Sequence, residues 1–599
     1  SVALRLIGWA SRFQKVVQAG DIAGERLFHP ECQWRDLVLL TWNIKTLEGC
    51  GAVSSALEEA RPSVGELVLA PLDDAKAVVG EDWTSADGQV ISGWFSVQTA
   101  AARGVARVAL SPDGEGFDRC SGLFTSMTEL IGHEEIIGFR RPLGHELHAV
   151  HGRSKPAKVK DHPYVLIIGG GQSGLMLAAR LKHLQVPTLV VEKLARPGDS
   201  WRRRYSSLHL HDVIWLCDMP YMPFPEHFPV YLSKDQYADW LDLYAEAMGL
   251  DFQGSTEVLK ASYDPSSQQW SVQLQQEGSQ IEIFKPAHVV LATGNAGRPK
   301  TPTFLGLDNF LGKVFHSSQF PGCSVNAPDW QGQRCVVVGS NTSAHDISQD
   351  LWEHGSEVTM LQRSPGCVIK TGRMRELAAA GGYSEEARKK GVTIAACDLR
   401  GAATPYGLRI PDCKAWVERI KVDDAEFYAQ LDDAGWRQTF GEDETGLYMM
   451  FLRTFRGYYF DIGASQLVAD RKIKLQSGTS IAEVKPRSVV LDNGHELPCD
   501  VLVLATGYQN MSELVERLIS PEVAQAIGPC WGLGSGVAGD EGPWEGELRN
   551  MWKPTAQPGL WFQGGNISLC RFHSLHLALQ LKAKYEKIFD LAPAECSNF

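Results

Sequence analysis

The chain has 599 residues, of which 44% are hydrophobic and 22% charged, a composition typical of a soluble globular protein. Its length corresponds to about three or four domains. The net charge of −13 argues against nucleic acid or an anionic membrane surface as the main partner. No apolar run approaches the ~18 residues of a membrane span. The thirteen cysteines form no C-x-x-C pair, which favours reduced thiols, a cytoplasmic location and no metal site.

The stretch that begins at Val165 has the pattern of a dinucleotide-binding unit. Four apolar residues predict a buried parallel strand, and glycines follow at G-x-G-x-x-G spacing before a helical run. The second apolar strand of this unit ends in Glu192, where a ribose hydroxyl needs an acceptor. A pyrophosphate would lie against the N-terminus of the helix. The candidate binding residues of this unit are Gly169, Gly171, Gln172, Ser173, Gly174, Glu192 and Trp201.

A second turn of the same kind follows the strand that begins at Arg334. Asn341 stands in place of the second glycine and Ala344 in place of the third. Because Asn accepts left-handed backbone angles better than other residues with a side chain, we expect this turn to survive. Arg363 ends the next strand, where a guanidinium can bind a 2′-phosphate. The candidates here are Gly339, Asn341, Ser343, Ala344 and Arg363, and Thr506, Gly507 and Tyr508 follow a later apolar strand.

Between the two turns lies an F-x-G-x-x-x-H-x-x-x-F pattern, formed by Phe310, Gly312, His316 and Phe320. Together with the Ala-Thr-Gly-Tyr run that ends at Tyr508, this pattern resembles the class B flavoprotein monooxygenases. The stretch from Leu208 to Tyr244 is most similar to the YUCCA-type subgroup of flavin-containing monooxygenases. Baeyer–Villiger relatives carry Trp at the position of Phe320.

The resemblance implies a reaction cycle in which NADPH reduces FAD and O2 forms a C4a-hydroperoxide on the flavin. One oxygen atom then passes to a small organic substrate, by N- or S-oxygenation or by oxidative decarboxylation or hydroxylation. Baeyer–Villiger insertion is an alternative. An NADPH oxidase-like flavoprotein and a degenerate nucleotide-binding scaffold, suggested by Asn341, are further alternatives. For the oligomeric state of the chain, a homodimer is the expectation.

Two histidines are the candidate catalytic residues. His211 falls at the flavin-side position of the family, where a histidine could donate a hydrogen bond near the flavin or be hydrogen-bonded within a loop. His316 belongs to the fingerprint and is expected to fix the linker between the nucleotide-binding domains.

The predicted fold class is α/β, with two nested Rossmann-like dinucleotide-binding domains and an N-terminal α+β domain. A helix over Leu4–Val17 followed by several strands resembles the cone-shaped domains of the nuclear-transport-factor-2-like superfamily. Trp34, Asp36 and Trp42 are interpreted as sheet core and turn residues in preference to a second active site. The expected order is the N-terminal domain (1–150), a linker (151–162), a FAD-binding domain (163–330), an NADPH-binding domain (331–497) with a helical insertion (370–450), and the second part of the FAD-binding domain (498–599).

Overall fold

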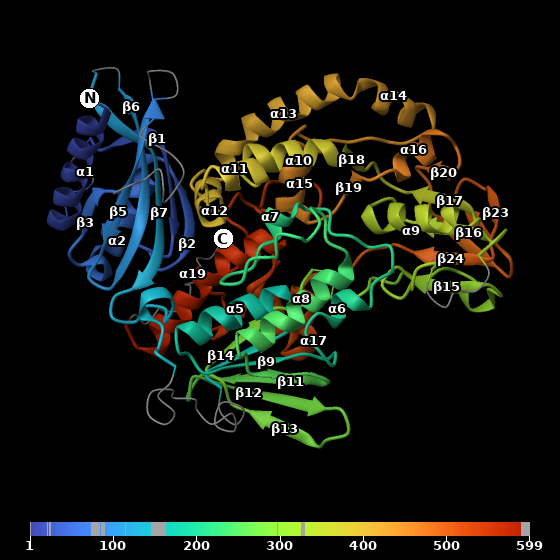
Figure 1. The fold of residues 1–599 in the computed structure, drawn as a ribbon, viewed down its shortest axis with the longest axis horizontal. Coiled ribbons are helices and arrows are strands. Elements are labelled where there is room, and N and C mark those ends of the chain that lie inside the picture. Colours follow the sequence, from blue (N-terminus) through green and yellow to red (C-terminus); the bar gives the residue numbers. More distant parts are fainter. Residues whose placement is uncertain are drawn as a thin grey trace.

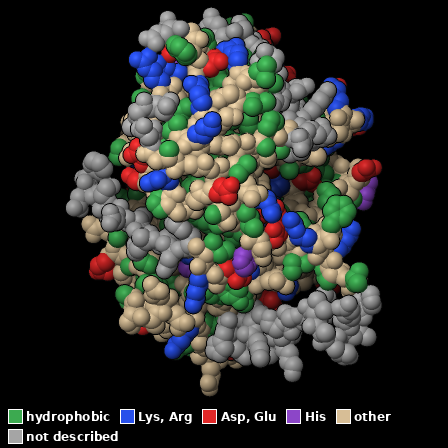
Figure 2. All heavy atoms as spheres, turned by 90° about the vertical axis from the view of Figure 1, so that its left-hand side faces the viewer, with side chains coloured by type: hydrophobic (Ala, Val, Ile, Leu, Met, Phe, Trp, Pro, Cys, Tyr) green, Lys and Arg blue, Asp and Glu red, His purple; other side chains and the backbone are tan. Residues whose placement is uncertain are grey.

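The structure is a computed structural model that describes residues 2–20, 22, 26–72, 84–85, 90–113, 116–144, 163–295, 297–324 and 330–588. The expected linker at 151–162 lies outside the described residues. Figure 1 shows the N-terminal domain as a separate layer, in blue, beside the nucleotide-binding part of the molecule. Figure 2 shows the outer face of that layer, where acidic and basic side chains are interspersed among apolar ones.

The N-terminal domain is a mixed sheet with the strand order β2-β1-β7-β6-β5-β3 and with β4 paired to β5. The predicted helix and strands of this domain are present. Helix α2 was not predicted, although Val53, Leu57, Ala60 and Val64 are buried at helical spacing. The elements are α1 (Val2–Ala19), β1 (Phe28–Leu37), β2 (Ile44–Glu48), α2 (Cys50–Val64), β3 (Val68–Pro71), β4 (Thr84–Ser85), β5 (Ile91–Gln98), β6 (Ala102–Pro112) and β7 (Asp118–Leu130).

Asp36 and Trp34 lie in the core of this sheet. The Asp36 carboxylate accepts hydrogen bonds from the backbone N–H groups of Leu40 and Thr41 and from the Thr125 hydroxyl. The Trp34 indole donates to the same hydroxyl at 2.8 Å. Burial raises the pKa of Asp36. These contacts agree with the interpretation of both residues as core and turn residues.

The first nucleotide-binding unit is a parallel five-stranded sheet with the order β10-β9-β8-β14-β25. Strand β25 comes from the last part of the chain, so the chain returns to its first nucleotide unit. A three-stranded antiparallel sheet, β11-β12-β13, is attached to it. The elements are β8 (Val165–Ile168), α5 (Gln172–His183), β9 (Thr188–Val191), β10 (Phe252–Gln253), β11 (Thr256–Asp264), β12 (Gln269–Gln276), β13 (Ile281–Phe284), β14 (His288–Leu291), β25 (Leu560–Phe562) and α19 (Ile567–Tyr585).

The second unit is a parallel sheet with the order β15-β24-β16-β17-β20. Its strand pairing differs from the predicted boundaries, because β15 and β24 were expected in the FAD-binding domain. Strand β24 is short, apolar and buried, and this pattern does not specify which of two parallel sheets a strand joins. Strand β15 is a partly exposed edge strand that lacks this pattern. The elements are β15 (Lys313–His316), β16 (Arg334–Val338), α9 (Thr342–Glu353), β17 (Glu357–Gln362), β20 (Lys474–Ser477) and β24 (Val501–Leu504).

The expected helical insertion forms an arch over the two nucleotide units, with α13 and α14 along its top (Figure 1). The strands that precede and follow its helices, β18 (Cys367–Lys370) and β19 (Tyr458–Asp461), pair in parallel with each other. Its helices are α10 (Thr371–Ala380), α11 (Glu385–Lys389), α12 (Ile394–Ala402), α13 (Ile410–Asp423), α14 (Ala425–Asp433) and α15 (Gly446–Thr454).

The remaining elements connect these units. Helix α8 begins after Ser233, which forms a reciprocal capping box with Gln236. These elements are η1 (Gly138–Arg140), α6 (Asp199–Arg202), α7 (Ile214–Cys217), α8 (Lys234–Ala247), η2 (Leu307–Asn309), η3 (Gly407–Arg409), α16 (Ala464–Ala469), β21 (Ile481–Lys485), β22 (Ser488–Leu491), β23 (Glu496–Pro498), α17 (Ser512–Leu518) and α18 (Pro521–Ile527).

Helix α19 joins the N-terminal domain to the first nucleotide unit. It packs against α5 on one side and against β7 on the other, and Figure 1 shows it between these two layers. Its side chains are buried almost all round, including His573 and His576. His576 Nε2 lies 2.9 Å from the Ser126 hydroxyl of β7. The N-terminal domain is therefore built into the molecule through a buried interface.

Candidate functional site

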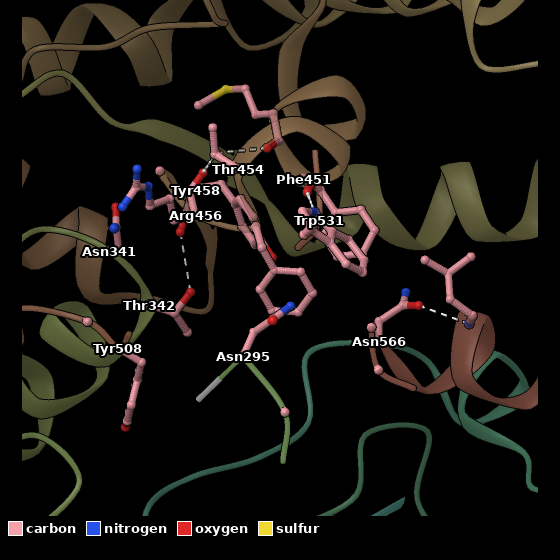
Figure 3. A pocket seen from close by; sticks show the side chains of 18 of the residues that line it. Asn295, Asn341, Thr342, Phe451, Thr454, Arg456, Tyr458, Tyr508, Trp531 and Asn566 are labelled. Carbon is pink, nitrogen blue, oxygen red and sulfur yellow. Dashed lines mark hydrogen bonds between the residues drawn. The ribbon is translucent and has the colours of Figure 1, made fainter. Parts of the chain in front are cut away.

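One cavity of about 3030 Å³ extends over both nucleotide units, the helical insertion and the last part of the chain. A pocket for a single small ligand occupies roughly 300–1,000 Å³. The cavity therefore has room for two nucleotides and a substrate. Figure 3 shows part of its wall, where Asn295 of the first unit, Asn341 and Thr342 of the second unit, and Asn566 at the start of α19 lie around a common space.

The three glycines of the first turn have three distinct steric roles. Gly169 has φ +116°, and a Cβ there would lie 2.5 Å from the carbonyl oxygen of Ala292. A Cβ on Gly174 would lie 2.0 Å from the Gly169 carbonyl oxygen, so this glycine permits close packing of α5 on the turn. A Cβ on Gly171 would meet no protein atom within 4 Å, and Gly171 lines the cavity. The open side of the turn thus faces the N-terminus of α5, which fits a pyrophosphate.

The other predicted residues of the first unit surround this turn. Glu192 follows β9, and its carboxylate accepts from the backbone N–H groups of Gly170 at 2.8 Å and Leu194 at 2.9 Å. The Trp201 indole donates to Gln172 Oε1 at 3.2 Å. Ser173 is buried in the first turn of α5. Glu192, Gln172, Ser173 and Trp201 all line the cavity, so the structure brings these sequence candidates together.

The second turn repeats this geometry with one difference. Gly339 has φ +127°, and a Cβ there would lie 2.4 Å from the Ala505 carbonyl oxygen. Asn341 has φ −98° and ψ −169°, close to the −78° and −176° of Gly171. The expectation that Asn341 needs left-handed angles is therefore wrong, because extended backbone at this position is open to any residue. Ala344 is buried, and Asn341, Ser343 and Ala344 line the cavity.

Arg363 follows the C-terminal end of β17, is exposed and lines the same cavity. Among the residues that the structure describes, no carboxylate forms an ion pair with its guanidinium. The turn after β24 also lines the cavity: the Thr506 hydroxyl donates to the Lys300 carbonyl at 2.6 Å, and Gly507 has φ +81°. The Tyr508 ring lies under the Arg204 guanidinium at 5.1 Å, and its hydroxyl accepts from that group.

The two candidate histidines lie in different surroundings. His211 lines the cavity, and its ring centroid is 4.5 Å from that of Phe460 on β19. His316 is 3% exposed, and burial lowers its pKa. Its Nε2 lies 3.1 Å from the Gly507 carbonyl oxygen and therefore donates to it, while Nδ1 is 2.9 Å from the Ser318 hydroxyl. His316 thus ties the fingerprint to the turn after β24, a contact that suits the expected role of fixing the linker.

A contact between the two units was missed from the sequence. The Tyr205 hydroxyl, from the first unit, donates at 2.7 Å to Oδ2 of Asp346, which lies on α9. Burial raises the pKa of Asp346 to about 6, more than the hydrogen bond from Tyr205 lowers it. The two residues are 141 positions apart, and no motif spacing relates them.

An aromatic cluster forms another part of the wall that sequence reasoning missed. The Trp531 ring lies 5.4 Å from Phe451 and 5.0 Å from Phe455, and its indole N–H donates to the Phe451 carbonyl at 2.9 Å. The exposed Arg456 also lines the cavity, and Figure 3 shows its guanidinium next to Asn341, on the far side of Tyr458 from Trp531. The cluster joins α15 of the insertion to the last part of the chain, and neither segment carries a recognisable motif.

Cys323, Asp350 and His354 are the one group with metal-ligand spacing among the residues that the structure describes. Asp350 accepts from the Cys323 backbone N–H at 3.0 Å, and His354 Nδ1 donates to the Asp350 backbone carbonyl at 2.7 Å. Burial raises the pKa of the Cys323 thiol, which disfavours the thiolate that a metal needs. These hydrogen bonds within the chain explain why the three side chains lie close together without a metal.

Comparison with known proteins agrees with this geometry. A family model described as pyridine nucleotide-disulphide oxidoreductase matches residues 166–374. The chain is 29% identical over 363 residues to "Indole-3-pyruvate monooxygenase YUCCA1" of Oryza sativa subsp. japonica, covering 60% of this chain and 80% of that protein. It is 26% identical over 350 residues to "Probable indole-3-pyruvate monooxygenase YUCCA10" of Arabidopsis thaliana, covering 58% and 82%.

A solved structure of a cyclohexanone monooxygenase with bound epsilon-caprolactone superposes with a TM-score of 0.51 at 18% identity. The match covers 71% of this chain and 88% of that one, and it shows a shared fold. No helix among the described residues is long and apolar enough to cross a membrane. The two nucleotide-binding units on one cavity and the sequence similarities together support a flavin-dependent monooxygenase with FAD and NADPH as its cofactors.

Proposed function

We propose that the chain uses NADPH, FAD and O2 to transfer one oxygen atom to a small organic substrate that enters the aromatic part of the cavity. The observation that carries this proposal is that both phosphate-binding turns and the aromatic cluster open onto one continuous space. A hydride donor, an acceptor and a small organic substrate can meet there without leaving the protein.

The residues of the chain divide the work between binding, orientation and exclusion of water. The turn of Gly169, Gly171 and Gly174 holds the FAD pyrophosphate, and Glu192 accepts from a ribose hydroxyl. Arg363 binds the 2′-phosphate that distinguishes NADPH from NADH. Bound FAD, once reduced by NADPH, would supply the chemistry that activates O2.

Orientation of the two units is the task of residues at their junction. The bond from Tyr205 to Asp346 joins the first unit to the second, and the bond from His316 to Gly507 fixes the ends of β15 and β24 within the second unit. His211 offers a ring nitrogen at the cavity wall as a hydrogen-bond donor. The aromatic rings around Trp531 keep the reacting centre dry, which limits loss of oxygen equivalents to water.

For the type of oxygenation, we propose oxidative decarboxylation of an aromatic 2-oxo acid, with N- or S-oxygenation as the next candidate. The aromatic cluster on the cavity wall suits an aromatic body, and the exposed Arg456, which lines the same cavity, offers a guanidinium for a carboxylate. The relatives named indole-3-pyruvate monooxygenases point to the same substrate class. Phe320, where Baeyer–Villiger relatives carry Trp, favours this proposal over that alternative.

The test is a panel of aromatic 2-oxo acids, tertiary amines, sulfides and cyclic ketones, offered with NADPH to the FAD-loaded protein. The proposal expects product from the 2-oxo acids, and weaker product formation after Arg456→Gln with unchanged flavin content. Lactone formation from the cyclic ketones, with 2-oxo acids left intact, would establish the Baeyer–Villiger alternative instead.

We also propose a nuclear-transport-factor-2-like fold for residues 1–150, a cytoplasmic location and a homodimeric assembly. The helix α1 packed on a curved sheet supports the first of these. Size-exclusion chromatography with light scattering tests the assembly, since a monomeric mass at micromolar concentration would exclude a stable dimer.

A further inference from the structure

Arg35 of the N-terminal domain reaches the cavity of the nucleotide-binding part. It lies on β1, is 1% exposed and is among the residues that line the cavity. A guanidinium so deeply buried needs partners for its donors, because an unpaired charge in such a place is strongly destabilising. The partners of Arg35 come from two segments far away in the sequence.

The first partner is Glu547, in the segment between α18 and β25. Arg35 Nε donates to Glu547 Oε1 at 2.6 Å and its Nη2 to Oε2 at 2.9 Å, a bidentate pair. Glu547 is 2% exposed and accepts a further bond from the Thr46 hydroxyl at 2.7 Å. Nearby, the Trp544 indole donates to Glu48 at 3.0 Å, so β1 and β2 hold this segment at several points.

The Glu547 segment carries one side of the aromatic cluster. Backbone bonds of 3.0 Å run from the Trp531 N–H to the Arg549 carbonyl and from the Arg549 N–H to the Gly532 carbonyl. Glu547 lies two residues from Arg549 on this paired stretch. A shift of Glu547 would therefore be passed to Trp531, and from Trp531 to Phe451 through the indole bond.

The second partner is the C-terminal end of α12 in the helical insertion. Arg35 Nη1 donates to the carbonyl of Ala402, the last residue of that helix, at 2.7 Å. A cation at this end satisfies an unpaired carbonyl and complements the helix dipole. The guanidinium also lies 4.5 Å over the ring of Tyr406. Asp398 of the same helix forms a bidentate pair with Arg571 of α19, at 2.7 and 2.8 Å.

We propose that Arg35 is a positioning residue through which the N-terminal domain holds two walls of the cavity, helix α12 and the segment that carries Trp531, at a fixed separation. The walls come from the insertion and from the end of the chain, and the guanidinium bonds both. The N-terminal domain thereby helps to form the substrate-binding part of the cavity (the substrate chamber) and takes no part in the redox chemistry. The consequence for turnover rests on the proposed monooxygenase function, whereas the structural consequence does not.

The test uses a double variant, because removing one partner alone would leave a buried charge. Replacing a buried ion pair by apolar residues of similar size is often tolerated, so Arg35→Met with Glu547→Met should fold. The matched control is Arg5→Met, which removes the same side chain from the partly exposed ion pair of Arg5 with Asp118 inside the N-terminal domain. All proteins are full-length and loaded with FAD.

Hydrogen–deuterium exchange is the first readout. In the double variant, amides of Ile394–Ala402 and of residues 544–549 should exchange about tenfold faster than in the wild type. Exchange in Gln172–His183 should be unchanged, and the control should match the wild type everywhere. Wild-type exchange in both segments, or an equal acceleration along the whole chain, would overturn the proposal.

Turnover is the second readout. The double variant should reduce its flavin with NADPH at the wild-type rate but lose coupling, so that more of the consumed NADPH appears as hydrogen peroxide. Full coupling in the double variant would overturn the link between Arg35 and the substrate chamber. If the wild type does not oxidise NADPH at all, the proposed function fails, and the exchange experiment still decides the role of Arg35.

Discussion

Adding one methyl group to the first phosphate turn should have different consequences at Gly171 and at Gly174. At Gly174 the new Cβ would lie 2.0 Å from a backbone carbonyl oxygen and 3.2 Å from Ile167 Cγ2. The backbone must move, and overpacking of this kind costs about 1–3 kcal/mol. Gly174→Ala should therefore lower the unfolding free energy of the apoprotein by that amount.

At Gly171 the same methyl group meets no protein atom, and the backbone is already extended. The loss of unfolded-chain entropy stabilises by about 0.4–1 kcal/mol. Alanine is a poorer N-cap than glycine, which offsets roughly that gain. The apoprotein should thus keep its stability to within about 1 kcal/mol. The methyl group nevertheless occupies the approach of the pyrophosphate, and losing one charge-assisted hydrogen bond of about 1.5–3 kcal/mol weakens FAD binding roughly ten- to a hundredfold.

The assay is denaturant unfolding of the apoproteins, followed by titration with FAD monitored by flavin fluorescence. Gly171→Ala should separate the two properties, with apoprotein stability retained and FAD affinity lost. Wild-type FAD affinity in Gly171→Ala would refute the placement of the pyrophosphate at this turn. Wild-type stability in Gly174→Ala would refute the close contact between α5 and the turn.

Three further predictions concern single side chains. Arg363→Ala should lower the preference for NADPH over NADH about ten- to a hundredfold, because it removes a charge-assisted hydrogen bond of about 1.5–3 kcal/mol. Steady-state kinetics with each cofactor measures this preference, and equal use of NADPH and NADH by the wild type would contradict the prediction. Because burial raises the Asp346 pKa to about 6, the native state binds a proton that the unfolded chain loses from about pH 4 upwards. The contribution of this group to stability therefore falls between about pH 4 and pH 6 and stays low above that. Asp346→Asn should flatten this slope in denaturant unfolding across the window, and an unchanged slope counts against it. His211→Ala should release more hydrogen peroxide per NADPH consumed and leave flavin reduction intact, whereas His316→Ala should slow flavin reduction itself. Stopped-flow reduction under nitrogen, followed by mixing with oxygen, distinguishes these two defects. Slow flavin reduction with fully coupled turnover in His211→Ala would refute the role of His211 as a hydrogen-bond donor near the flavin.

The parts of the site that were predictable from sequence are those in which the chemistry is local. A strand, a glycine turn and a helix follow one another within about twenty residues around Gly171, so spacing alone specifies the geometry. Strand β24 was assigned to the wrong sheet because a short apolar strand fits either of two parallel sheets. Arg35 and Glu547 are 512 positions apart, and Tyr205 and Asp346 are 141 apart. Such pairs are set by tertiary packing and leave no periodic signal.

The most direct test of the central claim is an isotope experiment with oxygen-18 gas in ordinary water. The FAD-loaded protein, given NADPH and a substrate from the accepted class, should place one labelled oxygen atom in the product for each NADPH consumed. A labelled product would show that O2 is the oxygen donor and that electrons from NADPH drive the transfer. Label that comes from water, or NADPH consumption that yields only hydrogen peroxide with every substrate class, would contradict the monooxygenase assignment.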